Sequence, residues 1–215
     1  MPRLISYKKS EFSMSTKLLF KFKSSRSLSE NIWPTRKITS KQKLILSKIR
    51  KKKLSNYGLK LQAKRALSIL YGKLSYNQYY KTREEASKLQ GKIGNNFISF
   101  LEKRLDTVVY RMNICSTFRS AKQLILHQKV FVNNKLVNIP SFQLEPGDII
   151  SISPLNQFNF ASLAKQSLRN FKENRICKTK CLHLEVNYKT LHAIFLYPPQ
   201  QLLNSYQLDI NLLTQ

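Results

Sequence analysis

The chain has 215 residues, 42% of them hydrophobic, which suits one large or two small folded domains and excludes disorder throughout. It carries 38 Lys and Arg against 11 Asp and Glu, a net charge of +27. Such a charge favours a polyanionic partner, and nucleic acid fits best because each neutralised phosphate releases counterions. An anionic membrane is the alternative, but the sequence has neither a run of 18 apolar residues nor a helix with a broad apolar face.

The first fifty residues are predicted to form a basic, extended tail. Residues 1–30 are basic, Ser-rich and poor in acids, like a mitochondrial transit peptide, although we expect them to be retained. From Asn31 to Arg83 the sequence contains no acidic residue. A cationic run is often only a solvated face, but one of this length predicts a surface held against phosphate. Its densest part supplies three candidate RNA-binding residues, Lys51, Lys52 and Lys53.

Helical periodicity begins near residue 59. Six residues recur at helical spacing and predict one apolar stripe: Leu59, Ala63, Ala66, Leu67, Leu70 and Leu74. Three cations fall outside this stripe and are candidates for contact with RNA: Lys60, Lys64 and Arg65. A second helix is expected over residues 75–90.

Two weaker motifs in this region each leave two interpretations open. Tyr71, Tyr76, Tyr79 and Tyr80 could stack on bases, but tyrosines at helical spacing are more often core residues with a polar tip. Gly91–Gly94 has the GxxG spacing of a backbone-clamping loop, but a plain inter-domain turn is favoured.

Beyond this turn the pattern predicts two further helices. The first begins at Asn96 as N-cap and continues to Met112, with Arg104 and Arg111 seven residues apart. At 3.6 residues per turn these arginines project on one side, away from the apolar stripe. The next helix begins near Ser116 or Thr117. It buries Phe118, Ala121, Leu124 and Ile125, and exposes Arg119 and Lys122.

The period then changes to that of strands. Residues 130–132 and 135–137 flank Asn133 and Asn134, which predicts a tight hairpin because Asn tolerates positive φ. A turn at residues 146–148 precedes a strand over residues 149–152. Residues 160–171 are predicted to be helical, and residues 182–187 and 191–197 to form two strands.

Several of these segments together resemble the family of small-subunit ribosomal protein four. The resemblance rests on 101-LEKRLD-106, 108-VVYRM-112, 121-AKQLI-125 with His127, 132-VN-133 and 137-VNIPS-141. It continues upstream through 54-LSNYG-58, 71-YG-72 and 89-LQG-91, and downstream in 183-HLEVN-187. It covers residues 53–198.

The resemblance implies an α+β fold, in which a helical domain packs beside a small RNA-binding module of two helices and a β-hairpin. We expect a tail over residues 1–50, a helical domain over 51–96, the module over 97–153, and a segment over 154–215 whose helix and strands return to the helical domain. The resemblance also implies a structural role in the small subunit, binding rRNA early in assembly near the mRNA entry path and near small-subunit proteins three and five.

Carried across by the resemblance, seven module residues are expected near phosphate or ribose: Arg104, Arg111, Lys122, His127, Lys129, Asn133 and Lys135. Arg119 joins them as an exposed cation. His127 could donate to phosphate or simply cap a helix C-terminus, where a cation is favoured. Replacing Arg104 and Arg111 together by Ala is expected to weaken rRNA binding and leave the fold intact.

The chain also departs from the family. Where many members carry Arg it has Phe118, with Arg119 one position on, and Ser120 replaces an acid that would complete a capping box. The family's N-terminal portion, which holds a zinc site in some members, is not recognised before Lys51. This divergence and the Lys-rich composition favour the mitochondrial matrix, in the mitochondrial ribosome, over a plastid or bacterial cytoplasm.

Other functions find less support in the sequence. The module also occurs in pseudouridine synthases and a tRNA synthetase, but too few residues remain for a catalytic domain, and no cofactor is expected. Cys177, Cys181 and His183 give C-x3-C-x-H, which needs a fourth ligand such as Cys115; His183 is expected to point outward on its strand, and no metal is expected. A free-standing RNA chaperone using the same module is the serious alternative.

Overall fold

The computed structural model describes residues 39–48, 55–115, 117–152, 181–199 and 213. The chain divides into two compact units, one of Met1–Leu70 with Ser205–Leu213 and one of Tyr71–Asn204 with Thr214–Gln215. The predicted helix over 160–171 lies outside the described residues, as do Lys51, Lys52 and Lys53.

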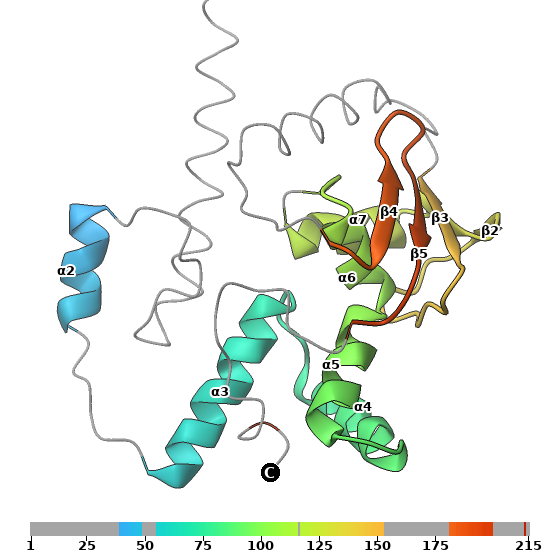
Figure 1. The fold of residues 1–215 in the computed structure, drawn as a ribbon. Helices are drawn as coiled ribbons and strands as arrows, with labels where there is room; N and C mark the ends of the chain where they lie inside the picture. The colour runs from blue at the N-terminus through green and yellow to red at the C-terminus, as the bar shows by residue number, and fades with distance from the viewer. Residues whose placement is uncertain (1–38, 49–54, 116, 153–180, 200–212, 214–215) are drawn as a thin grey trace, which may run out of the picture. The chain divides into compact units, whose positions relative to one another are not determined.

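The described part of the first unit contains helices α2 (Ser40–Lys48) and α3 (Asn56–Leu70) (Figure 1). The amide of Gly58 donates to the hydroxyl of Ser55, so α3 begins with a side-chain cap. Ala66, Leu67 and Leu70 are buried, which confirms the C-terminal half of the predicted stripe, whereas Leu59 is exposed.

The second unit begins with helices α4 (Tyr76–Lys88) and α5 (Ile93–Glu102). The sequence predicted Asn96 as the N-cap of this helix, but α5 begins three residues earlier, so Asn96 does not cap it. Its side-chain amide instead donates to the carbonyls of Ala86, Leu89 and Gln90, at the C-terminal end of α4. The rings of Tyr79 and Phe97 pack edge to face. These contacts join α4 to α5 within the second compact unit, which begins at Tyr71.

The helix predicted from residue 96 to 112 is broken in two, α5 and α6 (Leu105–Arg111). Arg104 is extended and forms an isolated β-bridge with Gln143. The amide of Leu144 donates to the carbonyl of Lys103, and the amide of Leu105 donates to the carbonyl of Phe142. Backbone from the 140–144 loop therefore takes the hydrogen bonds that a continuous helix would have made.

The predicted helix after residue 117 is confirmed as α7 (Phe118–Leu126). The hydroxyl of Thr117 accepts a hydrogen bond from the amide of Ser120, and this caps the helix. Phe118, Ala121 and Ile125 are buried, as predicted, and Leu124 is half-buried.

The predicted hairpin is also confirmed, as β1 (Val130–Val132) and β2 (Lys135–Leu136). Asn133 and Asn134 have φ of 49° and 62°, the left-handed conformation that a tight two-residue hairpin turn needs. The predicted turn at Gly147, with φ of 97°, leads into β3 (Ile149–Ile152).

The two predicted C-terminal strands are present as β4 (Leu184–Asn187) and β5 (His192–Phe195). β5 pairs with β3, which gives one antiparallel sheet in the order β2-β1-β3-β5-β4 (Figure 1). The hairpin and the C-terminal strands therefore form a single sheet within the second unit.

Candidate nucleic-acid interface

Helix α7 presents the first basic side chains of the candidate interface. Its N-cap, Thr117, fixes where the helix begins, and its apolar side is buried through Phe118, Ala121 and Ile125. Arg119 and Gln123 lie four residues apart on the helix and are both exposed. The amphipathic pattern of α7 therefore directs Arg119 outward, as predicted.

Three more candidates continue from the end of α7 onto the hairpin. His127 is the exposed C-cap residue, and Gln128 turns the chain with a φ of 57°. Lys129 follows, half-buried, immediately before β1, and Lys135 is exposed on β2. The α7–hairpin surface is defined here as Arg119, Lys122, His127, Lys129 and Lys135.

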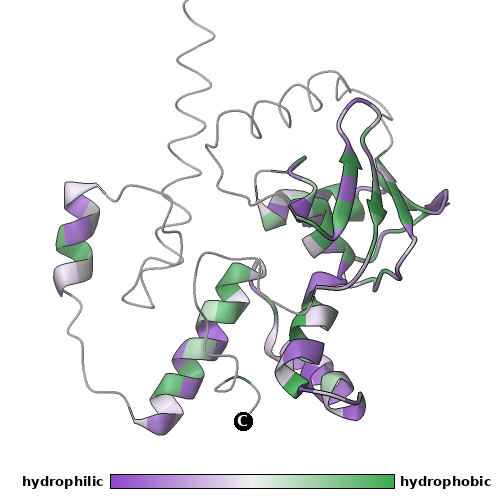
Figure 2. Cartoon of the chain, viewed as in Figure 1, coloured by the Kyte–Doolittle hydropathy of each residue, from purple (hydrophilic) through white to green (hydrophobic). Residues whose placement is uncertain are grey.

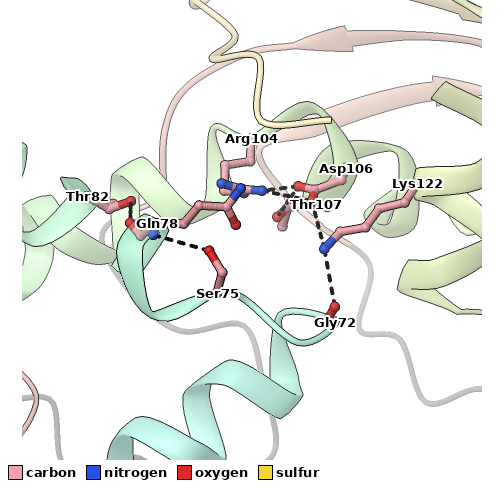
Figure 3. Close-up of polar contacts among 8 residues, drawn as sticks. All are labelled: Gly72, Ser75, Gln78, Thr82, Arg104, Asp106, Thr107 and Lys122. Atoms are coloured by element: carbon pink, nitrogen blue, oxygen red, sulfur yellow. Dashed lines mark hydrogen bonds and ion pairs between the residues drawn. The ribbon is translucent and has the colours of Figure 1, made fainter. Parts of the chain in front are cut away.

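Lys122 is the half-buried member of this surface on the helix itself. Its Nζ donates to the carbonyl of Gly72 at 3.2 Å and lies 3.7 Å from Asp106 Oδ2 (Figure 3). The expectation that Lys122 is exposed is thus only partly met, since its ammonium also ties α7 to the chain segment ahead of α4.

Arg104 is buried, so the expectation that it projects outward is wrong. Its Nε and Nη2 donate to the two oxygens of Asp106, at 3.2 and 3.0 Å (Figure 3). The hydroxyl of Thr107 also donates to Asp106, at 3.4 Å. Because α6 begins anew after Arg104, the seven-residue spacing to Arg111 no longer sets a common helical face.

Arg111 is also buried, and the same correction applies to it. Its Nη2 and Nε donate to Glu102 at 2.6 and 3.1 Å, and the hydroxyl of Tyr71 donates to Glu102 at 2.7 Å. Burial by itself would lower the pKa of Arg111, but the Glu102 carboxylate raises it above its ordinary value. Burial, and then Glu102, raise the pKa of Tyr71 well above its ordinary value. This is a charged internal cluster, so replacing Arg111 by Ala is expected to destabilise the fold.

Asn133 lies on the exposed hairpin, but its side chain is used inside the protein. Its Oδ1 accepts a hydrogen bond from the amide of Ile149 at 2.9 Å, and its Nδ2 donates to Asp148 at 2.8 Å. These contacts hold the hairpin turn against the start of β3. The predicted contact of Asn133 with RNA stays a prediction.

In the first unit, α3 carries the other described candidates. Arg65 is exposed, and Lys60 and Lys64 are half-buried on the same helix. Of the four tyrosines considered for base stacking, Tyr71 and Tyr79 are buried, whereas Tyr76 and Tyr80 are exposed. The stacking interpretation therefore applies only to the last two.

Sequence reasoning missed the two carboxylates that pair with the buried arginines, Glu102 and Asp106. The scarcity of acidic residues could have indicated them, because the chain has only 11 acidic residues against 38 basic ones. An acidic residue within an apolar stretch of such a chain is a candidate partner for a buried cation.

The C-x3-C-x-H cluster differs from its prediction. His183 is buried and not turned outward: its ring packs edge to face on Phe195. Cys181 is also buried, and Cys177 lies outside the described residues. Within the described ranges, no three His, Cys, Asp or Glu side chains gather closely enough to hold a metal ion. In the same ranges, no helix is long and apolar enough to cross a membrane.

Two short helices followed by a hairpin, with cations along the second helix, define a small RNA-binding module of the kind found in ribosomal proteins. Residues 103–150 match the S4 domain, and residues 6–102 match the ribosomal protein S4/S9 N-terminal domain. The N-terminal portion of the family is therefore recognisable from residue 6, and the expectation that it could not be recognised before Lys51 is wrong.

Individual relatives agree with these domain matches. Over 200 residues the chain is 44% identical to small ribosomal subunit protein uS4m of Marchantia polymorpha, covering 90% of this chain and 97% of that protein. It is 36% identical over 163 residues to uS4m of Reclinomonas americana, covering 72% of this chain and 63% of that protein. With uS4 of Aquifex aeolicus it shares 50% identity over 103 residues, 48% of this chain and 49% of that protein. The chain belongs to the small ribosomal subunit protein uS4 family, a family of ribosomal proteins and not of enzymes.

Proposed function

We propose that the chain is a structural constituent of the small ribosomal subunit and binds its rRNA through the α7–hairpin surface. The observation that carries this proposal is the exposure of Arg119, His127 and Lys135 along one helix and the hairpin that follows it. Lys122 and Lys129 add cations between them. Exposed cations can neutralise phosphates and gain from counterion release, whereas the buried arginines cannot.

The internal ion pairs support this surface indirectly. Asp106 holds Arg104 and lies near Lys122, while Glu102 holds Arg111. A phosphate contact is specific in shape only when the cations that make it are held at fixed spacing. Arg104 and Arg111 therefore act by positioning α6 and α7 and do not themselves meet the RNA.

Recognition by such a surface is expected to read the shape, the backbone and the 2′-hydroxyls of folded RNA more than base edges. The cations of α3 (Lys60, Lys64 and Arg65) and the basic cluster Lys51, Lys52 and Lys53 would form a second contact with rRNA. The two contacts together would organise the rRNA during assembly.

The cellular setting follows from the relatives. The proteins from Marchantia polymorpha and Reclinomonas americana both carry the name uS4m, which supports a place in the mitochondrial ribosome. Within the small subunit we propose proteins three and five as neighbours, and a position near the mRNA entry path. A free-standing RNA chaperone is not favoured, because the alignment with the ribosomal protein uS4m of Marchantia polymorpha covers 90% of this chain and 97% of that protein.

Binding of the purified full chain to a small-subunit rRNA junction fragment, measured over a salt series, tests the RNA surface. The variant Arg119→Gln/Lys135→Gln should bind more weakly and reduce the slope of log K against log salt by about 0.7–0.9 for each phosphate that is no longer neutralised. The matched control is Lys81→Gln/Lys189→Gln, which removes two exposed cations of α4 and of the β4–β5 loop. An equal decrease in affinity in both variants would mean that only total charge matters, and the α7–hairpin surface would have no special role.

A further inference from the structure

Tyr76 and Tyr80 form an exposed aromatic pair on α4, away from the α7–hairpin surface. They lie four residues apart on one side of the helix and are 61% and 37% exposed. Their ring centroids are 4.5 Å apart in an edge-to-face arrangement, and a hydrogen bond of 2.5 Å joins their hydroxyl oxygens. More than half of Tyr76 therefore faces solvent, while Tyr80 packs against it.

The pair is anchored to the core through Tyr79. The ring of Tyr80 packs edge to face on the ring of Tyr79, with centroids 5.4 Å apart, and Tyr79 is buried. Tyr79 packs in turn on Phe97 of α5, with centroids 5.3 Å apart. Ser75 caps α4 immediately before the pair and fixes where the helix begins. The two rings are thus preorganised, so a ligand that binds them costs little side-chain freedom.

The surface around the pair is polar and includes a cation. Figure 2 shows α4 coloured largely as hydrophilic. Its other exposed residues are Asn77, Lys81, Glu84, Ser87 and Lys88. Arg83 follows Tyr76 by seven residues, so it lies on the same side of the helix as the pair. Burial raises the pKa of Tyr79 to about 12, and the guanidinium of Arg83 acts against that rise, which places this cation close to the aromatic residues.

These features decide between possible ligands. A protein partner would need contiguous apolar surface, and the exposed residues of α4 supply only the two rings. Duplex RNA presents phosphates and groove edges, but its bases are already stacked on one another. An unpaired nucleotide offers both an open base face for an aromatic ring and a phosphate for a cation. The unpaired nucleotide is therefore the ligand that matches both the rings and Arg83.

We propose that the Tyr76–Tyr80 pair is a stacking site for an unpaired base of RNA. The base lies on the exposed ring of Tyr76, which Tyr80 supports, and Arg83 neutralises a phosphate beside it. Because every base has a face that can stack, the site selects unpaired over paired nucleotides and does not select one base over another. This inference rests on the proposed function, since it concerns the same chain bound to rRNA, but it uses no residue of the α7–hairpin surface.

The first test compares two RNA probes, an oligouridine of about 12 nucleotides and a duplex of the same length. Tyr76→Leu/Tyr80→Leu in the full chain removes both rings but keeps apolar side chains. It should bind the oligouridine about tenfold more weakly, as expected for the loss of one stacked base, and bind the duplex as the wild-type chain does. Tyr76→Phe/Tyr80→Phe keeps the rings without the hydroxyls and should bind both probes normally. Weaker oligouridine binding by the Phe variant would assign the contact to the hydroxyls and overturn the stacking site.

An exposed tyrosine elsewhere provides the matched control. Tyr57 is 73% exposed on α3, and no second ring packs on it within the described residues, so Tyr57→Leu should leave oligouridine binding unchanged. An equal loss with Tyr57→Leu, an equal loss for the duplex, or unchanged binding by the double Leu variant would each overturn the proposal. Arg119→Gln/Lys135→Gln should weaken both probes alike, so failure of the α7–hairpin surface and failure of the stacking site give different results.

A second readout uses the assembled particle and does not depend on the stability of the Leu variant. Photo-crosslinking benzoylphenylalanine at position 76 of the full chain, in purified small subunits, keeps an aromatic ring at the site. It should crosslink to an rRNA nucleotide whose base-pairing edge reacts with small chemical probes in the same subunits, as the edge of an unpaired base does. A crosslink to a protein, a crosslink to a nucleotide within a continuous duplex, or no crosslink would overturn the proposal.

Discussion

Arg111 and Glu102 form a buried, bidentate ion pair in which Nη2 and Nε of the arginine donate to the two carboxylate oxygens at 2.6 and 3.1 Å. The hydroxyl of Tyr71 donates to the same carboxylate, so both oxygens of Glu102 have partners. The pair joins the last residue of α5 to the last residue of α6, across the break at Arg104. It therefore fixes the angle between two helices that would otherwise be connected by an extended backbone.

Removing one member of this pair should be far more costly than removing a surface pair. Glu102→Gln leaves the guanidinium of Arg111 buried without a counter-charge, and it should lower the free energy of unfolding by about 3–5 kcal/mol. Urea unfolding of the purified full chain measures this quantity. Glu84→Gln is the matched control: its partner Lys88 lies at 2.9 Å, but both side chains are exposed, so a decrease below about 0.5 kcal/mol is expected. Similar decreases in the two variants would show that the buried pair has no structural role.

Gly72 occupies a position that no larger residue fits. Its φ is +69°, and a Cβ added to it would lie 2.5 Å from Cβ of Phe118. Phe118 cannot withdraw easily, since its ring stacks on Tyr110 with centroids 3.9 Å apart. The carbonyl of Gly72 also accepts the hydrogen bond from Lys122.

Gly72→Ala should therefore lower the free energy of unfolding by about 2–4 kcal/mol, the sum of left-handed strain and steric overlap. Gly147→Ala separates the two contributions, because Gly147 has a φ of +97° but no atom within 4 Å of an added Cβ. Chemical denaturation should show a smaller decrease for the variant at position 147. If that decrease were the larger one, the close approach of Phe118 would not be the reason for glycine at position 72.

Much of this fold could be predicted because its signals are local. The Asn-Asn turn of the hairpin, the start of a helix near Thr117 and the strand over residues 149–152 depend on residues within a few positions of one another, and all three predictions are confirmed. The break between α5 and α6 depends on the 140–144 loop, about forty residues away, and no local pattern indicates it.

The same limit explains the errors in the candidate site. Helical spacing predicts external positions for Arg104 and Arg111 because a continuous helix would turn them outward, and the break removes that premise. The pairing of β5 with β3 is likewise a long-range contact between two strands that each have an ordinary alternating pattern. Periodicity identifies the elements but cannot identify their partners.

Asn133 should matter for stability through its side chain as well as its backbone. Asn133→Ala removes the acceptor for the amide of Ile149 and the donor to Asp148, and it should lower the free energy of unfolding by about 1–3 kcal/mol. Asn134→Ala is a close control: φ is also positive, but its side chain makes no hydrogen bond to the residues that the structure describes. Thermal melting of both variants measures the difference, and equal decreases would mean that only the turn conformation counts. Weaker rRNA binding by a fully folded Asn133→Ala variant would instead support a direct contact with RNA.

His183 should make the stability of the second unit depend on pH. Its ring is buried between Phe195 and Tyr197, and neither ring nitrogen forms a hydrogen bond within the described part of the chain. Burial lowers the pKa of His183 below its ordinary value of 6.5, with Glu102 raising it and Arg111 lowering it further. The folded protein therefore holds this histidine neutral where the unfolded chain begins to bind a proton.

Stability from this residue is fully present above about pH 6.5 and is lost as the pH falls below that value, because the unfolded state then takes up a proton that the folded state does not. The decrease is at most about 1.4 kcal/mol per pH unit. Urea unfolding at pH 7.0, 6.0 and 5.5 should show this slope in the wild-type chain and a flatter one in His183→Leu, whatever the difference in stability at pH 7. The window lies above the ordinary titration of Asp and Glu, so carboxylates contribute little to the difference. Parallel slopes in the two proteins would mean that His183 takes up its proton equally well in the folded and unfolded states.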